Sequence, residues 1–597
     1  MSNHLSRAAS AVLCAVLLGI PAPIGEGRAN HFPAPAGAAD DQAAAQQAPP
    51  IRTTTRLVQV SVIVRDKNGN PVDNLTKDDF VVSDKGQAQK ISTFSMERLT
   101  RATETKTAPT TVTNTFSNRL EEAGAPTSVT VILLDGLNTR ILDQTYARDE
   151  ILKFLGQLQP HDRVALYALS GSGLRVLHDF TSDATPLIEA LNRYRTRDPS
   201  AVRAANPALA QNIPGTRQSD TSATAPGGSG GMAAADYDFD TWLNSVLQQT
   251  ADFYMVNRVR ETADAMIAIA NHVARLPGRK NLVWVSGSFP FDYGLDRVYG
   301  PISGTRSPSD RQIFVDEIRR VARAMNNANV AVYPVDARGL VGPYGETVAA
   351  AVGFIPREAV GRGPVGPRAT LGNVYAGIDT MKDMAERTGG RAFYNTNDIK
   401  EGIRKAVADS EVTYTLAFYP NHNNWDGSFR KIKVEVKRGG LDVRYRLGYF
   451  AMPDEQLTAK QKEDLIQQIA AGPLDATELG VTVRPALDSS TTPGGVVAQI
   501  NVSGKDLSLE LKNGAWEGQL QLLMVQRMED GRVVGSSGEV LDIAIPDQAI
   551  ERVRSDGLNI TRKMQLAARV DELRVAVRDG SSGAVGSVTV PMKRLMK

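Results

Sequence analysis

Oxygen-bearing side chains cluster directly after one apolar stretch, in the segment VILLDGLNTR over residues 131–140. Four apolar residues run into Asp135, and Asn138 and Thr139 follow in the next turn. In an open parallel sheet, ligands bind in the crevice at the carboxyl ends of the strands. Hard cations such as Mg²⁺ take oxygen ligands. The segment therefore predicts either a ligand or cation site at Asp135, or a loop in which Asp135 only accepts backbone hydrogen bonds.

The elements that must position this segment alternate between strand and helix from residue 128 onward. In the helical stretch over residues 311–328, Ile318, Val321 and Met325 fall on one face. Such alternation predicts the α/β class, with a doubly wound, mostly parallel sheet covered by helices on both faces. The strands are predicted at residues 129–134, 163–169, 174–180, 281–287 and 330–336.

Bulk composition limits the possible function. At 597 residues the chain is too long for one core, so several domains are expected. A hydrophobic content of 42% and a charged content of 22% are those of an ordinary globular protein. Because 68 basic residues face 66 acidic residues, no overall field attracts nucleic acid or anionic lipid.

The amino terminus has the layout of a secretory signal peptide. Arg7 precedes an apolar core over residues 8–20, and small residues lead to a predicted cleavage site near Ala29. The only cysteine, Cys14, lies inside this segment, so the mature protein is expected to contain no disulfide. No later segment is apolar enough over a sufficient length to span a bilayer. We therefore expect an exported protein, periplasmic, extracellular or associated with the cell envelope; retention of the segment as an anchor is the less favoured alternative.

Changes of composition divide the chain into predicted units. Residues 57–97 alternate in the period of a half-buried strand and contain turn clusters, which predicts a small β module. Repeated short strands after residue 478 predict a β-sandwich. The predicted organisation is a signal peptide (1–29), a disordered lead-in (30–56), a β module (57–97), a linker (98–127), an α/β domain (128–452) with insertions at 196–240 and 339–372 and a β-hairpin at 413–451, a helical linker (453–477) and a β-sandwich (478–597).

Several blocks in this order resemble von Willebrand factor type A (vWA) domains. They are the Asp-terminated first strand, PGRKNLVWVSGSFP, VAVYPVDARGL and AERTGGRAFYNTNDI. The segments LTKDDFVVSDKGQAQKISTF and FRKIKVEVKRGGLDVRYRLGYF make the chain similar to the bacterial, acidobacterial-type VWFA-related proteins in particular. The resemblance covers roughly residues 57–452, and it implies the α/β fold predicted from the alternation.

The resemblance also implies a metal-ion-dependent adhesion site, in which a D-x-S-x-S loop and two further loops hold a divalent cation for an acidic group of a protein partner. Asp135 matches the Asp of this motif and Thr139 its second hydroxyl. Leu137 stands at the first Ser position and cannot bind a metal, and Asn138 offers a carbonyl oxygen one position away. Ser286 stands where the family has an acidic residue. With so few carboxylates, Mg²⁺ is expected to bind weakly or not at all.

The remaining loop Thr of the family site has no clear match. Thr241 is a candidate, and the acidic segment around it offers replacement carboxylates, although such a segment is most often a solvated loop. Asp336 also ends a strand and could pair with Arg338 or bond a neighbouring loop; such a structural role is favoured over a metal-binding role. The replacement carboxylates are Asp236, Asp238 and Asp240.

Enzyme motifs are missing from the sequence. No HExxH, phosphate-binding Walker loop or dinucleotide fingerprint is present, and Gly287 before Ser288 does not complete a G-x-S-x-G elbow. His178 lies near a strand end but has no evident Ser or Asp partner in the sequence. We therefore expect a protein without catalytic residues and without an organic cofactor.

Together these observations predict an exported, non-enzymatic protein that binds or adheres to a protein ligand through a degenerate metal-ion-dependent adhesion site. The alternatives are a metal-independent structural or assembly factor of the cell envelope and, least favoured, a periplasmic hydrolase. The identity of the partner and the oligomeric state stay open. The residues predicted to contact the partner are Asp135, Leu137, Thr139, Ser288 and Asp292.

Overall fold

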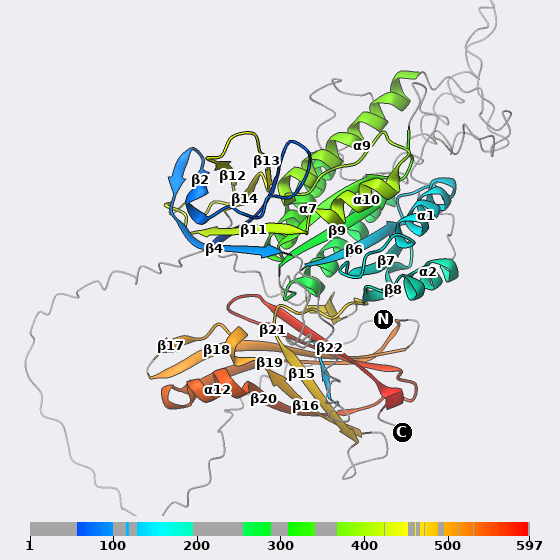
Figure 1. Cartoon of the computed structure of the whole chain (residues 1–597). Helices are drawn as coiled ribbons and strands as arrows, with labels where there is room; N and C mark the ends of the chain where they lie inside the picture. The colour runs from blue at the N-terminus through cyan, green and yellow to red at the C-terminus, as the bar shows by residue number, and fades with distance from the viewer. Residues whose placement is uncertain are drawn as a thin grey trace, which may run out of the picture.

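The computed structural model describes residues 57–98, 115–118, 128–194, 253–287 (except 255 and 277), 308–340, 367–451 (except 423) and 472–594 (except 488–494, 513 and 529–530), with a few positions between 460 and 470. In the helices that begin at residues 308 and 367, side chains are described from residues 316 and 377 onward. The described chain forms one α/β unit and two β-sandwiches (Figure 1). The predicted signal peptide, the lead-in and most of both predicted insertions lie outside the described residues.

The sheet of the α/β unit has five strands in the order β10-β9-β6-β7-β8. The pairs β10·β9, β9·β6 and β6·β7 are parallel, whereas β7 and β8 are antiparallel. Only residues 171 and 172 separate β7 from β8, which is too short for a parallel crossover. The strands are β6 (Ser128–Asp135), β7 (Val164–Ser170), β8 (Gly173–Thr181), β9 (Arg279–Ser286) and β10 (Val330–Asp336).

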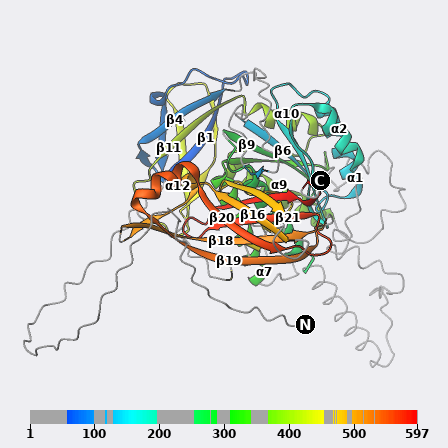
Figure 2. The same ribbon diagram turned by 90° about the horizontal axis from the view of Figure 1, so that it is seen from below.

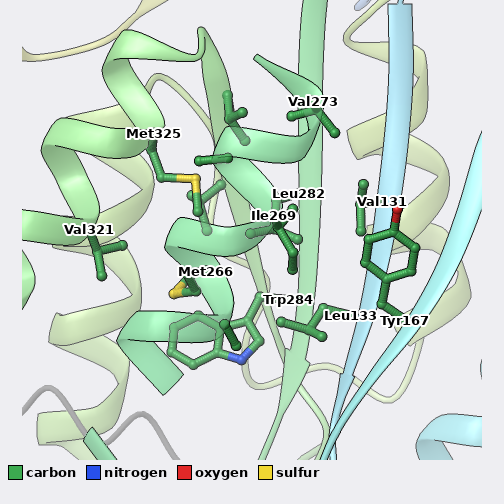
Figure 3. Packing of buried hydrophobic residues seen from close by; sticks show 14 of the residues in the cluster. Val131, Leu133, Tyr167, Met266, Ile269, Val273, Leu282, Trp284, Val321 and Met325 are labelled. Carbon is green, nitrogen blue, oxygen red and sulfur yellow. The ribbon is translucent and has the colours of Figure 1, made fainter. Parts of the chain in front are cut away.

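Helices cover both faces of this sheet, because alternate residues of its strands enter two different hydrophobic clusters. Val131 and Leu133 of β6 pack on the helix over residues 256–273 and on α7 and α9, as Figure 3 shows in part. Ile132 and Leu134 pack on the other face, against α1, α2 and α10. The labelled helices are α1 (Ile141–Leu155), α2 (Ala184–Arg193), α7 (Pro308–Asn327), α9 (Pro367–Thr388) and α10 (Ile399–Ala408).

The predicted β module and the predicted hairpin at 413–451 are parts of one β-sandwich. Its sheets have the orders β13-β1-β11-β4 and β14-β12-β2-β3, so β1 pairs with β11 although more than 340 residues separate them. The hairpin was predicted to belong to the α/β domain; instead its apolar side chains share a core with those of β1. The strands are β1 (Val58–Arg65), β2 (Phe80–Asp84), β3 (Gln87–Gln89), β4 (Ile91–Arg98), β11 (Val412–Phe418), β12 (Phe429–Val436), β13 (Asp442–Tyr445) and β14 (Gly448–Phe450).

The carboxyl-terminal residues form a second sandwich around their own core. Its sheets have the orders β20-β16-β15-β5 and β17-β18-β21-β22. Strand β19 pairs with β18 along residues 515–527, and Figure 2 shows these two strands from below. Strand β5 comes from the segment that was predicted to be a linker. The elements are β5 (Phe116–Ser117), β15 (Val481–Leu487), β16 (Gly495–Val502), β17 (Glu510–Lys512), β18 (Ala515–Arg527), β19 (Val533–Pro546), α12 (Ile550–Asp556), β20 (Leu558–Gln565), β21 (Glu572–Asp579) and β22 (Val585–Pro591).

Taken over the described residues, the chain is a mixed α/β protein with several sheets. Parallel pairing between these described strands is confined to the sheet of the α/β unit, and the pairs in the two sandwiches are antiparallel.

A buried carboxylate fastens the first sandwich to the α/β unit. Asp409 caps the carboxyl end of α10, and its side chain is only 4% exposed. Arg444 of β13 donates to both carboxylate oxygens, at 2.7 and 2.6 Å. Arg65 of β1 donates at 3.1 Å, and the Tyr333 hydroxyl of β10 donates at 3.0 Å. Side chains from two strands of the sandwich and from one strand of the α/β sheet therefore bond to the same carboxylate.

The second sandwich rests on the last turn of the helix over residues 256–273. The Thr477 backbone N–H donates to the carbonyl of Asn271 at 3.0 Å, and a ring nitrogen of His272 is 2.8 Å from the carbonyl of Asp475. Arg275, just beyond the helix, donates twice to the carbonyl of Glu478. These bonds fix one end of this helix.

We predict that Asp409→Asn lowers the free energy of unfolding of the full chain by about 3–5 kcal/mol, because it leaves two arginines beside a neutral group in a buried pair. Asp442→Asn is the matched control, since Asp442 lies 3.7 Å from the same Arg444 but is 66% exposed. We expect a change of about 0–1 kcal/mol there. Urea unfolding followed by circular dichroism measures both, and equal losses in the two variants would contradict the role given to Asp409.

Candidate functional site

The loop after β6 turns into the protein instead of lying open at the sheet edge. Asp135 was predicted to bind a ligand or contact a partner at this edge, which requires an accessible carboxylate, but it is 1% exposed. The backbone N–H groups of Gly136 and Leu137 both donate to the carbonyl of Leu169 in β7, at 2.8 and 3.1 Å. These bonds direct the Leu137 side chain into the core beneath the sheet, where it is 1% exposed. The prediction of an exposed carboxylate was therefore wrong.

Four hydrogen bonds from protein groups satisfy the Asp135 carboxylate. Its Oδ1 accepts the backbone N–H of Asn138 at 3.0 Å. Its Oδ2 accepts the Asn138 side-chain amide at 2.8 Å, and the indole N–H of Trp284 and the Ser286 hydroxyl at 2.9 Å each. Burial raises the pKa of Asp135 above its ordinary value of 3.8, whereas these hydrogen bonds act to lower it. Asp135, Asn138 and Ser286 are thus brought together, as the sequence predicted.

A buried arginine completes this network, and sequence reasoning missed it. Arg258 is 6% exposed and donates from Nε and Nη2 to the side-chain carbonyl of Asn138, at 3.0 and 2.8 Å. The Thr262 hydroxyl accepts the Asn138 amide at 2.9 Å and donates to the carbonyl of Arg258. Burial lowers the pKa of Arg258, and the nearby charge of Asp135 raises it.

One sequence signal could have found this pair. Arg258 and Thr262 are four residues apart, so they share a face of the helix over residues 256–273. That face otherwise carries buried apolar residues such as Val259 and Met266. A charged and a hydroxyl side chain on an apolar face require a buried polar partner. Thr241, proposed as the loop hydroxyl, lies outside the described residues, and Thr262 places a hydroxyl beside Asn138.

The Thr139 hydroxyl links two loops. Thr139 is 2% exposed, and its Oγ1 accepts the backbone N–H of Gly287 at 2.8 Å. A Cβ on Gly287 would lie 3.1 Å from the Thr139 methyl, which is a very tight contact. The bond therefore holds the loop after β6 against the loop after β9.

The described residues around Asp135 do not fit a divalent cation. Mg²⁺ requires near-octahedral oxygen ligands, several of them anionic or water. The site offers one carboxylate whose oxygens already accept four protein donors, and the guanidinium of Arg258 holds the neighbouring amide oxygen. Within the described part of the chain, no three His, Cys, Asp or Glu side chains gather in a metal-binding arrangement.

The residues predicted to contact a partner fall into two groups. The side chains of Asp135, Leu137 and Thr139 are buried, so none of these three is available at the surface as predicted. Ser288 and Asp292 lie outside the described residues, as do the proposed replacement carboxylates Asp236, Asp238 and Asp240.

Other groups are exposed at the carboxyl edge of the sheet. Arg140 follows the loop after β6, and Leu340 follows β10 with 48% of its surface exposed. The backbone N–H of Leu340 donates to the side-chain carbonyl of Asn397 at 2.8 Å, which fixes its position. Beside it, Arg338 donates to both oxygens of Asp336, at 2.9 and 2.7 Å, so the structural pair predicted for these two residues is confirmed.

We predict that Arg258→Ala lowers the free energy of unfolding by at least about 2 kcal/mol, because the buried Asn138 carbonyl loses both donors. Arg260→Ala is the control on the same helix; Arg260 is exposed, and we expect a change within about 0.5 kcal/mol. Chemical denaturation of the two variants provides the comparison. A variant without Arg258 that is as stable as the control would show that Asn138 does not depend on this arginine.

Comparisons with known proteins give similarity only at the level of solved structures. No protein-family model matches the chain, and no curated protein sequence matches it. The VWA domain of SpRpn10 is 12% identical, with coverage of 47% of this chain and 96% of that chain and a TM-score of 0.20. A von Willebrand factor type A structure from Catenulispora acidiphila is 9% identical, with coverage of 64% and 80% and a TM-score of 0.22. At these values the matches carry no argument about function, and the strand order and pairing of this chain define its fold.

Proposed function

We propose that this chain is an exported, non-enzymatic protein-binding protein, and that its doubly wound, vWA-type α/β domain binds a protein partner without a metal ion. The signal-peptide pattern over residues 1–29 supports export. Within the described residues, no helix is both long and apolar enough to cross a membrane. The absence of enzyme motifs in the sequence supports a binding role rather than a catalytic role.

The observation that carries this proposal is the position of Arg258 beside the Asp135 loop. In a metal-dependent adhesion site, a cation provides the positive charge that receives an acidic group of the partner. Here a guanidinium lies next to the loop, is 6% exposed and donates both of its bonds to Asn138. Because this charge is buried and bonded to Asn138, it stabilises the loop and is not accessible to a partner. Recognition would therefore use exposed groups around the loop.

Arg140 and Leu340 are such groups. Arginine is enriched among the residues that account for much of the binding energy of an interface, and an exposed leucine adds apolar surface that a partner can bury. The backbone N–H of Leu340 is bonded to Asn397, so binding of a partner costs little backbone conformational entropy at this residue. Arg140 follows β6 and Leu340 follows β10, and these two strands run in the same direction in one sheet. The two residues therefore share the carboxyl edge of that sheet.

The same observation also favours a second candidate, a metal-independent structural or assembly factor of the cell envelope. Such a factor would hold its partner constitutively, and chelators would not release it. The two β-sandwiches fixed to the α/β unit suit a rigid part of an assembly. The two candidates differ in whether the partner exchanges in solution or stays bound.

We predict that calorimetric titration of the full chain with Mg²⁺ or Mn²⁺ gives no heat beyond dilution, because the Asp135 oxygens are already engaged. The Asp135→Ala variant should give the same flat titration. A saturable heat that disappears in Asp135→Ala would contradict a metal-independent site.

We further predict that replacing Arg140 with Glu and Leu340 with Asp lowers partner capture at least about tenfold, a loss of about 1.4 kcal/mol. Capture is measured by cross-linking in intact cells that export the full chain, with and without EDTA. Val533→Asp is the control, because Val533 is 52% exposed but lies on β19 of the second sandwich. Capture that EDTA abolishes, or that the control lowers equally, would contradict the proposed surface.

A further inference from the structure

Residues 115–118 lie on the edge of the second sandwich, whereas the described strands before and after them, β4 and β6, belong to the first sandwich and to the α/β unit. Strand β5 pairs antiparallel with β15, with Phe116 opposite Val483 and Ser117 opposite Thr482. The segment thereby extends the sheet beyond β15, which would otherwise present unpaired backbone groups at the edge. The bonded groups are more than 360 residues apart in the sequence. The segment therefore pairs with β15 in the way that a separate bound peptide would.

Asn118 anchors the segment through every polar atom of its side chain. Its Nδ2 donates to the carbonyls of Ala476 and Leu479, at 2.7 and 2.8 Å, and its Oδ1 accepts the backbone N–H of Val481 at 2.8 Å. The residue is 8% exposed, and its backbone N–H donates to the Val481 carbonyl at 3.1 Å. An aspartate could not supply the two donated bonds, so the pocket selects an amide.

The other two side chains add an apolar and a polar contact. Phe116 packs against the core of the sandwich and is half-buried. The Ser117 hydroxyl lies 3.1 Å from the Thr482 hydroxyl and donates to the Val481 carbonyl at 3.3 Å. Phe116 and Asn118 are two residues apart, so they fall on the same side of an extended strand. In recognition by strand addition, backbone bonds give affinity and such alternate side chains give specificity.

We propose that the β15 edge is a binding site for an extended peptide that carries an aromatic residue followed two positions later by asparagine, and that residues 115–118 occupy this site as an intramolecular ligand. The site lies on the second sandwich, so it is independent of the function proposed for the α/β unit. A ligand within the same chain has an effective concentration of about millimolar order. A separate peptide would therefore bind poorly to the intact chain and well to a chain whose own segment is weakened.

The test uses a fluorescent peptide of residues 111–122 (TVTNTFSNRLEE) and the full chain with Phe116→Ala and Asn118→Ala. We expect this double variant to bind the peptide at least about tenfold more tightly than the wild-type chain does. A peptide with the same two alanines should bind the variant at least about tenfold more weakly. Equal binding to both chains, or no binding to a double variant that unfolds cooperatively at a wild-type-like temperature, would overturn the proposal.

A second measurement keeps the proposal testable if the double variant does not fold. Ser117→Cys with Thr482→Cys places two thiols at positions whose hydroxyl oxygens are 3.1 Å apart. In a chain that also carries Cys14→Ser, mild oxidation of this pair should give a disulfide within one chain, and Ser117→Cys alone should give none. A covalent dimer would show that a second copy donates the segment, which would overturn its intramolecular role. A folded protein that forms no disulfide would contradict the pairing itself.

Discussion

The buried carboxylate of Asp135 is the constraint on which the carboxyl edge of the α/β unit depends. A carboxylate removed from water is costly unless donors surround it. Asn138 donates from the same loop, and Trp284 and Ser286 donate from the neighbouring strand β9. Arg258, from the helix that precedes β9, holds the amide of Asn138 in the orientation that this donation requires. Arg258 therefore closes the loop after β6, and the polar side chains of this loop bond to groups inside the protein.

The helix that carries Arg258 also connects the site to the rest of the molecule. Its last turn is bonded to the second sandwich through Asn271 and His272. On the opposite edge of the sheet, Asp409 joins α10 to two strands of the first sandwich. The α/β unit is thus held on two sides by polar contacts with buried or half-buried groups. The helix that carries Arg258 cannot shift without breaking these contacts. The position of Arg258 is therefore preorganised.

Local sequence patterns could predict the α/β sheet, because β6, β9 and β10 are buried on both faces and appear as continuous apolar runs within a residue or two of the predicted bounds. The same patterns could not predict that β1 pairs with β11, since every half-buried strand alternates in the same way. The burial of Asp135 could not be predicted from local patterns either. Asp135 is bonded to Asn138, and Asn138 is held by Arg258, which lies 120 residues away in the sequence. The pairing of Asp336 with Arg338 was predictable because the two residues are sequence neighbours.

In the proposed site, a guanidinium and not a metal ion supplies the positive charge beside the loop after β6. The most direct measurement is a crystal structure of the full chain soaked in Mn²⁺, with anomalous scattering recorded at the manganese edge. We expect ordered density for Arg258 in contact with Asn138 and no anomalous peak near Asp135. A manganese peak in bonding contact with Asp135, with Arg258 displaced from Asn138, would contradict the account.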